Sequence, residues 1–172
     1  MLIQADLGLL STPPQKAFGA PLAGSLIPWI DKQLDNGQSR EEWKGEAETN
    51  KILGLSPGTI PVNGLCIRVG VIRCHSAAIT LKLKREVSEK EFASLVTHSH
   101  PWVNYVPNNK DESVSRLTPA YISGSLQVGV GRYKKMSLNN DPIYSVLTVG
   151  DQLLWGAAEP LRRMLNILLG KI

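Results

Sequence analysis

The chain has 172 residues, of which 42% are hydrophobic and 20% charged, as expected for a soluble globular domain with its own core. Its net charge is only +4 and few aromatic residues lie among the basic ones, which disfavours nucleic-acid binding. The two cysteines form no disulfide framework, no apolar run approaches the roughly 20 residues of a membrane span, and the N-terminus lacks a signal-peptide pattern, so we expect a cytoplasmic protein without a membrane partner.

A capping box at Ser39 and Glu42 predicts the first clear helix. Before it, the segment 18–30 contains small residues, glycines and prolines that divide it into turns. The helix should run to about Leu53, because Gly54 is suited to the left-handed conformation in which many helices end.

This helix is unusually polar and has only a thin apolar stripe. One interpretation is a solvated helix, and the alternative is a helix that walls a polar pocket. Glu41 and Lys44 are three residues apart and therefore project from one face. A carboxylate and an ammonium group side by side can bind the amine and the anion of a zwitterionic ligand.

The segment 66–76 is rich in β-branched residues and carries Arg68 near one end and His75 near the other. Their odd spacing would place them on opposite faces of an unbroken strand. Gly70 lies between them and predicts a bulge or bend, which would bring both side chains to the same side. An arginine that binds a carboxylate and a histidine that transfers a proton would then share one pocket.

The rest of the chain contains strands and helices without a regular βαβ alternation. Alternating or apolar patterns predict strands at 78–84, 103–107, 125–133 and 143–149, a polar loop at 108–113 and a turn at 139–142. This segregation predicts an α+β fold, with a mixed, largely antiparallel sheet covered by helices.

Two further helices are expected in this region. One follows a second capping box at Ser88 and Glu91, and the last is capped by Asp151 and kinked near Gly156 by Pro160. At the end of the first of these lie two histidines with no carboxylate or thiol at ligand spacing, so we expect no metal site there. These histidines are His98 and His100.

Four segments resemble aspartate-β-semialdehyde dehydrogenase of the bacterial, NADP-dependent type. They are FGAPLAGSLIPWID at 18–31, EEWKGEAETNKI at 41–52, LCIRVGVIRCHS at 65–76 and VGDQLLWGAAEPLRRML at 149–165. The resemblance assigns 18–172 to the family's C-terminal catalytic and dimerisation domain, whose fold is similar to the C-terminal domain of glyceraldehyde-3-phosphate dehydrogenase-like enzymes. Residues 1–17 match the family poorly.

The resemblance implies a reaction and a role for each matched residue. The family reduces L-aspartyl-4-phosphate with NADPH to L-aspartate 4-semialdehyde and phosphate, for lysine, methionine and threonine biosynthesis. By motif, Glu41 would bind the α-amine of the substrate, Lys44 the phosphate and Arg68 the α-carboxylate. His75 would be the general acid/base and Gln152 would contact the nicotinamide end of NADP. A homodimer is implied as well.

The family's Rossmann domain, with its glycine-rich dinucleotide loop and its nucleophilic cysteine, lies outside the resemblance. Neither Cys66 nor Cys74 can be assigned as the nucleophile, so we expect the isolated chain to be inactive. Two alternatives to the enzyme stay open: a non-catalytic dimerisation module derived from this family, and a related N-acetyl-glutamyl-phosphate reductase. Glu41 disfavours the second, because an acetylated amine needs no carboxylate partner.

Overall fold

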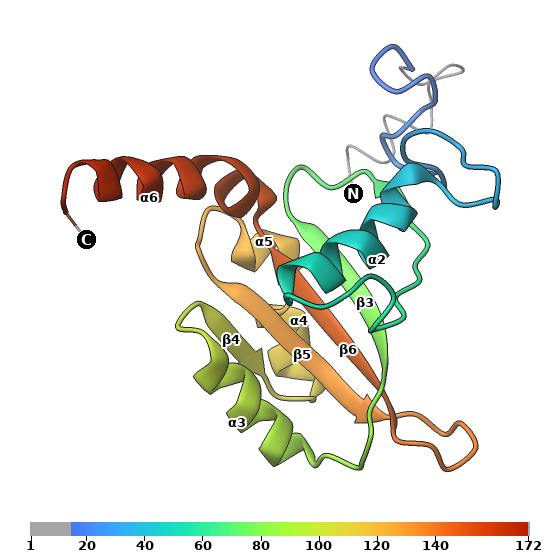
Figure 1. The fold of residues 1–172 in the computed structure, drawn as a ribbon, viewed down its shortest axis with the longest axis vertical. Helices are drawn as coiled ribbons and strands as arrows, with labels where there is room; N and C mark the ends of the chain where they lie inside the picture. The colour runs from blue at the N-terminus through green and yellow to red at the C-terminus, as the bar shows by residue number, and fades with distance from the viewer. Residues whose placement is uncertain (1–14, 172) are drawn as a thin grey trace. The chain divides into compact units, whose positions relative to one another are not determined.

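Two separate β-sheets organise the chain, one in each of two units that span Met1–Gly70 and Val71–Ile172. The computed structural model describes residues 15–171. The first unit contains a two-stranded sheet and the second a four-stranded sheet, whose strands β3 to β6 are labelled in Figure 1. Among the described helices, none is long and apolar enough to cross a membrane.

Residues 15–70 of the first unit contain one short sheet and one helix. Strand β1 (Leu26–Ile27) pairs antiparallel with β2 (Arg68–Val69), and α2 spans Arg40–Ile52. The predicted capping box is confirmed, because Ser39 Oγ accepts a hydrogen bond from the Glu42 N–H and Glu42 Oε2 accepts one from the Ser39 N–H. Gly54 has a φ of +68°, which confirms the predicted left-handed stop.

The second unit has four strands in the order β3-β6-β5-β4. They are β3 (His75–Lys82), β4 (Val103–Val106), β5 (Val128–Lys135) and β6 (Ile143–Gly150). Only the β4–β5 pair is parallel, so the predicted mixed, largely antiparallel sheet is confirmed. The turn before β6 is confirmed too, since Asn139 and Asn140 both adopt positive φ.

Helices cover both faces of this sheet (Figure 1). The covering helices are α3 (Glu89–Ser99), α4 (Lys110–Arg116) and α5 (Pro119–Ile122). The π-helical turn η1 (Leu154–Ala158) and α6 (Glu159–Leu168) follow the last strand, and α6 extends away from the sheet (Figure 1). On one face, the ring of Phe92 from α3 stacks on Tyr133, which stacks on Tyr144. On the other face, Leu117 and Ile122 pack with strand residues.

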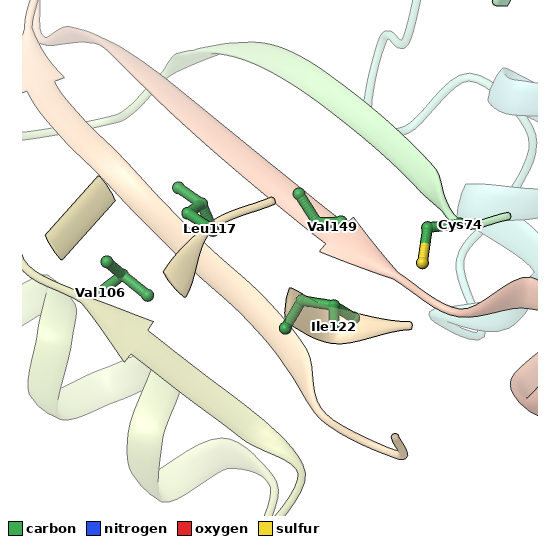
Figure 2. Packing of buried hydrophobic residues seen from close by; sticks show 5 residues of the cluster. All are labelled: Cys74, Val106, Leu117, Ile122 and Val149. Carbon is green, nitrogen blue, oxygen red and sulfur yellow. The ribbon is translucent and has the colours of Figure 1, made fainter. Parts of the chain in front are cut away.

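Alternate side chains of β6 point to opposite faces of the sheet and contribute to both of these cores. Tyr144 and Val146 are buried with the aromatic stack, whereas Val149 is buried in the second core, which Figure 2 shows. The other labelled members of the second core are Cys74, Val106, Leu117 and Ile122. The central strand is thus buried on both faces, which matches its nearly continuous apolar sequence.

The glycines of β5 make room for this second core. A Cβ on Gly131 would lie 2.7 Å from the carbonyl oxygen of Val106 and 2.9 Å from Leu117 Cδ2, and one on Gly129 would lie 3.0 Å from Leu117 Cδ1. The strand does carry a bulge, between Gly131 and Lys134. Close approach of neighbouring chain segments therefore explains the glycines better than bending alone.

Three local predictions need correction. The segment 108–113 is no loop, because Asn109 caps α4 by accepting a hydrogen bond from the Glu112 N–H at 2.9 Å. Ser88 does cap α3, but the Glu91 carboxylate pairs with Arg85 instead of completing a capping box. The irregularity that Pro160 imposes takes the form of a π-helical turn, and α5 was not predicted at all.

Cation–π contacts and one hydrogen bond hold η1 and α6 to the preceding part of the second unit, and an ion pair forms within α6. The Arg163 guanidinium lies 3.9 Å from the ring centre of Trp102 and 5.2 Å from that of Trp155. The indole N–H of Trp155 donates to the carbonyl oxygen of Leu126, and the buried Glu159 carboxylate pairs with Arg163.

Candidate functional site

The polar helix α2 presents the carboxylate and the ammonium group predicted from their spacing. Glu41 Oε2 and Lys44 Nζ lie 3.0 Å apart, and both side chains are partly exposed. The hydrogen bond from Lys44 to the Glu41 carboxylate raises the pKa of Lys44, so its ammonium group is charged at neutral pH. A zwitterionic ligand can exchange this single ion pair for two, one at each side chain.

Glu42 ties this helix to the segment that leads into β2. Besides accepting from its own N-cap residue Ser39, it accepts a hydrogen bond at Oε1 from the Cys66 N–H at 3.0 Å. These two backbone hydrogen bonds lower the pKa of Glu42. Cys66 is two residues before Arg68, so the carboxylate fixes the Arg68 strand relative to α2. The sequence indicated only the capping role.

Asn50 provides a second tie within the same unit, and sequence reasoning missed it. The side chain is 1% exposed, and its amide group donates to the carbonyl oxygen of Ile60 and accepts from the Ile60 N–H, each at 2.9 Å. No sequence signal marks it, because an asparagine inside a polar helix normally faces water.

Arg68 is held by an aromatic ring rather than by an acid. Its guanidinium lies 4.7 Å from the ring centre of Phe18, and no carboxylate in the described part of the chain forms an ion pair with it. Gly70 permits close approach, since a Cβ there would lie 2.8 Å from the carbonyl oxygen of Leu22. The guanidinium therefore keeps its hydrogen-bonding edges available for a carboxylate ligand.

The prediction of one bent strand across 66–76 is wrong. Arg68 belongs to β2 in the first unit, and His75 begins β3 in the second. The five residues between the two strands, 70–74, have irregular backbone, and Cys74 adopts a φ of +82°. The chain leaves one sheet and enters another here because its backbone turns sharply, not because a bulge interrupts a single strand. Whether Arg68 and His75 share a pocket stays a prediction.

His75 and Gln152 come to the same end of the four-stranded sheet. His75 is the strand partner of Gly150, and Gln152 follows Gly150 by two residues. The His75 side chain is exposed to solvent, so its imidazole can exchange protons with a ligand. Gln152 is partly buried, and among residues 15–171 its Oε1 finds no hydrogen-bond donor.

Both thiols lie in surroundings that disfavour the thiolate. Burial, followed by the negative charge of Asp151, raises the pKa of Cys74, whose thiol donates to the carbonyl oxygen of Pro119 at 3.6 Å. Burial, followed by the charges of Glu42 and Glu41, raises the pKa of Cys66. A nucleophilic cysteine needs the opposite environment, so neither thiol is suited to attack a carbonyl.

Asp151 caps the continuous helical stretch 152–168, which includes η1 and α6, as predicted. It also makes a second contact that the sequence did not reveal. Its Oδ1 accepts from the Leu153 N–H at 3.1 Å, and its Oδ2 lies 2.7 Å from Arg73 Nη2. The Gly124 N–H also donates to Oδ2, at 2.7 Å. An aspartate before a helix is a common cap, and nothing in its neighbourhood points to an arginine so far away in the sequence.

The family model described as the semialdehyde dehydrogenase dimerisation domain matches residues 4–155. The chain belongs to the semialdehyde dehydrogenase family. This semialdehyde dehydrogenase domain is also similar to the solved aspartate semialdehyde dehydrogenase from Francisella tularensis, at 46% identity and a TM-score of 0.83. That match covers 92% of this chain and 43% of the Francisella protein.

Two solved structures of aspartate semialdehyde dehydrogenase II from Vibrio cholerae share the fold of this semialdehyde dehydrogenase domain. One, complexed with ASA, is 24% identical with a TM-score of 0.75, covering 88% of this chain and 43% of that one. The other is 23% identical with a TM-score of 0.78, covering 97% and 48%. The chain thus spans less than half the length of these relatives, and its described residues contain no Rossmann-like domain.

The resemblance and the fold class predicted from the sequence are confirmed by these matches. The family model begins at residue 4, and the boundary that we place at residue 18 stays a prediction. The roles of the site residues stay predictions as well. They form two groups: Glu41, Lys44 and Arg68 in the first unit, and His75 and Gln152 in the second.

Proposed function

We propose that the chain is the catalytic and dimerisation half of an aspartate-semialdehyde dehydrogenase. The reaction is the NADPH-dependent reductive dephosphorylation of L-aspartyl-4-phosphate to L-aspartate 4-semialdehyde, which serves lysine, methionine and threonine biosynthesis. The observation that carries the proposal is the 46% identity to the Francisella tularensis enzyme over 92% of the chain.

The first unit supplies the groups that bind substrate. Glu41 takes the α-amine, and Lys44, freed from its ion pair, takes the phosphate. Arg68 binds the α-carboxylate with two parallel N–H groups, a geometry that lysine cannot reproduce. The tether from Glu42 to the Cys66 N–H supports this assignment, because it holds the arginine strand to the helix that carries the other two groups.

The second unit supplies the proton-transfer group. The exposed imidazole of His75 can move a proton to or from the reacting oxygen. NADPH, when bound, would supply the hydride. Gln152 fits a contact to the carboxamide of the cofactor, since its Oε1 is an acceptor suited to an amide N–H and has no donor within the described part of the chain.

The experiment separates substrate binding from proton transfer. The chain is joined to the part of the Francisella tularensis enzyme that it does not match, and steady-state kinetics are measured with aspartate semialdehyde, phosphate and NADP. Arg68→Lys should cost about 1.5–3 kcal/mol, or roughly ten- to hundredfold in kcat/KM, partly through KM. His75→Asn should lower kcat by about 10²–10⁴-fold and leave KM nearly unchanged.

Three results would contradict this assignment. A higher KM at constant kcat in His75→Asn would make the histidine a binding group. Turnover of N-acetyl-glutamate semialdehyde in preference to aspartate semialdehyde would favour the related reductase over the proposed enzyme. If the parent hybrid dimerises but is inactive with both aldehydes, the non-catalytic module is the better description of the chain.

A further inference from the structure

The carboxylate of Asp151 contacts three separate segments of the described second unit. The side chain is completely buried. It binds the Arg73 guanidinium at 2.7 Å, the Gly124 N–H at 2.7 Å and the Leu153 N–H at 3.1 Å. These partners come from before β3, from after α5 and from the start of the last helix.

Two of these partners adjoin residues assigned to the reaction. Arg73 precedes His75 by two residues, and Leu153 directly follows Gln152. We propose that Asp151 is a positioning residue of the dehydrogenase: it fixes the start of β3 and the start of the last helix, so that His75 and Gln152 stay together at one end of the sheet. This inference rests on the function proposed above.

The backbone at the start of β3 needs such a support. Cys74 adopts a φ of +82°, which is unfavourable for any residue with a Cβ and persists only where the surroundings hold it. Burial of the Cys74 side chain against Ile122 and Val149 holds one side of this turn (Figure 2). The Arg73–Asp151 ion pair holds the other, and His75 then projects to solvent.

The site requires a carboxylate rather than an amide. All three partners are donors, and an aspartate accepts at both oxygens. Burial alone would raise the pKa of Asp151, but the hydrogen bonds from Gly124, Arg73 and Leu153 outweigh it and lower the pKa, so the group is charged at neutral pH. Asparagine would turn an N–H₂ toward at least one of these donors.

The guanidinium depends on this contact in turn. Arg73 Nε is buried and has no hydrogen-bond partner among the described residues, so Asp151 is the acceptor that orients the group. If the carboxylate is removed, Arg73 loses this acceptor and the turn before His75 loses one of its two supports.

The test uses the histidine side chains as reporters in the 172-residue chain. The chain contains three histidines, and His98 and His100 lie at the end of α3, outside the Asp151 contacts. Imidazole NMR signals are recorded for the parent, for Asp151→Asn and for Arg73→Lys, which keeps the charge and is expected to have the smaller effect. We expect the His75 imidazole and Gln152 amide signals to move, and those of His98 and His100 to stay.

The matched control is Glu159→Gln. It also neutralises a buried carboxylate paired with arginine, but on α6, away from both reporters in sequence. It should leave the His75 signal unchanged. If Asp151→Asn does not fold, Arg73→Lys and Arg73→Gln test the same ion pair from its more exposed partner. Unchanged His75 and Gln152 signals in every folded variant would overturn the proposal.

A kinetic measurement in the hybrid enzyme distinguishes positioning from general destabilisation. In Asp151→Asn, kcat should fall by up to roughly 100-fold, because a small displacement of a catalytic group is enough for such a loss, while KM for the semialdehyde stays within about threefold. Equal kcat in parent and variant would overturn the positioning role. An inactive parent hybrid would instead overturn the proposed function, and the NMR comparison does not depend on that activity.

Discussion

Asn50→Asp should destabilise the first unit although it changes a single atom. The amide nitrogen donates to the carbonyl oxygens of Glu46 and Ile60 at 3.1 and 2.9 Å. Aspartate keeps the acceptor for the Ile60 N–H but loses both donors and points a charged oxygen at the two carbonyls. A buried group left without its partner costs about 1–3 kcal/mol, so the loss of both donors should cost about 2–5 kcal/mol.

The matched control is Asn63→Asp. The Asn63 side chain is exposed and accepts at Oδ1 from the Gly64 N–H at 2.8 Å, a bond that aspartate retains. The free energy of unfolding of the Asn63→Asp variant should stay within about 0.5 kcal/mol of that of the parent chain. Asn50→Asp should also regain stability below about pH 4, because a protonated carboxyl group supplies one donor again.

The assay is urea unfolding followed by fluorine NMR of the four tryptophans labelled with 5-fluorotryptophan. Trp29 and Trp43 report on the first unit, and Trp102 and Trp155 report on the second. We expect the midpoint seen by Trp29 and Trp43 to fall in Asn50→Asp. The reasoning is refuted if this midpoint equals that of Asn63→Asp.

Two further predictions concern packing and association. Gly131→Ala should destabilise the chain by about 1–3 kcal/mol in thermal unfolding, because the added Cβ would lie 2.7 Å from the Val106 carbonyl oxygen. The control Gly45→Ala in α2, whose added Cβ would have no described neighbour within 4 Å outside its own helix backbone, should stabilise the chain by up to about 1 kcal/mol. Equal effects of the two substitutions would contradict the close packing at Gly131. The chain should also self-associate at micromolar concentration, because the edge strand β3 and the apolar side chains of α6 are exposed. Sedimentation velocity measures this, and a monomer would count against the proposed homodimer.

Much of the local structure could be predicted from the sequence because it depends on neighbours a few residues apart. The capping box of α2, the turn at Asn139–Asn140 and the alternation of β6 all belong to this class. The helix α4 was missed because its polar composition resembles a loop, although Asn109 and Glu112 are spaced as a cap and its partner.

The candidate site divides in the same way. The spacing of Glu41 and Lys44 on one helix face was sufficient to predict their contact. The link between Glu42 and Cys66 and the burial of Asn50 were beyond prediction, because each depends on where a distant segment of the chain passes.

By itself, the sequence determined the family, the fold class and the residues that carry the proposed chemistry. Only the tertiary structure decided that 66–76 divides between two sheets, that His75 lies opposite Gly150, and that Arg73 reaches Asp151. The physical reason is the range of the forces involved. Caps and alternation act between near neighbours, whereas strand pairing and buried ion pairs form only where packing of the whole unit brings distant residues together.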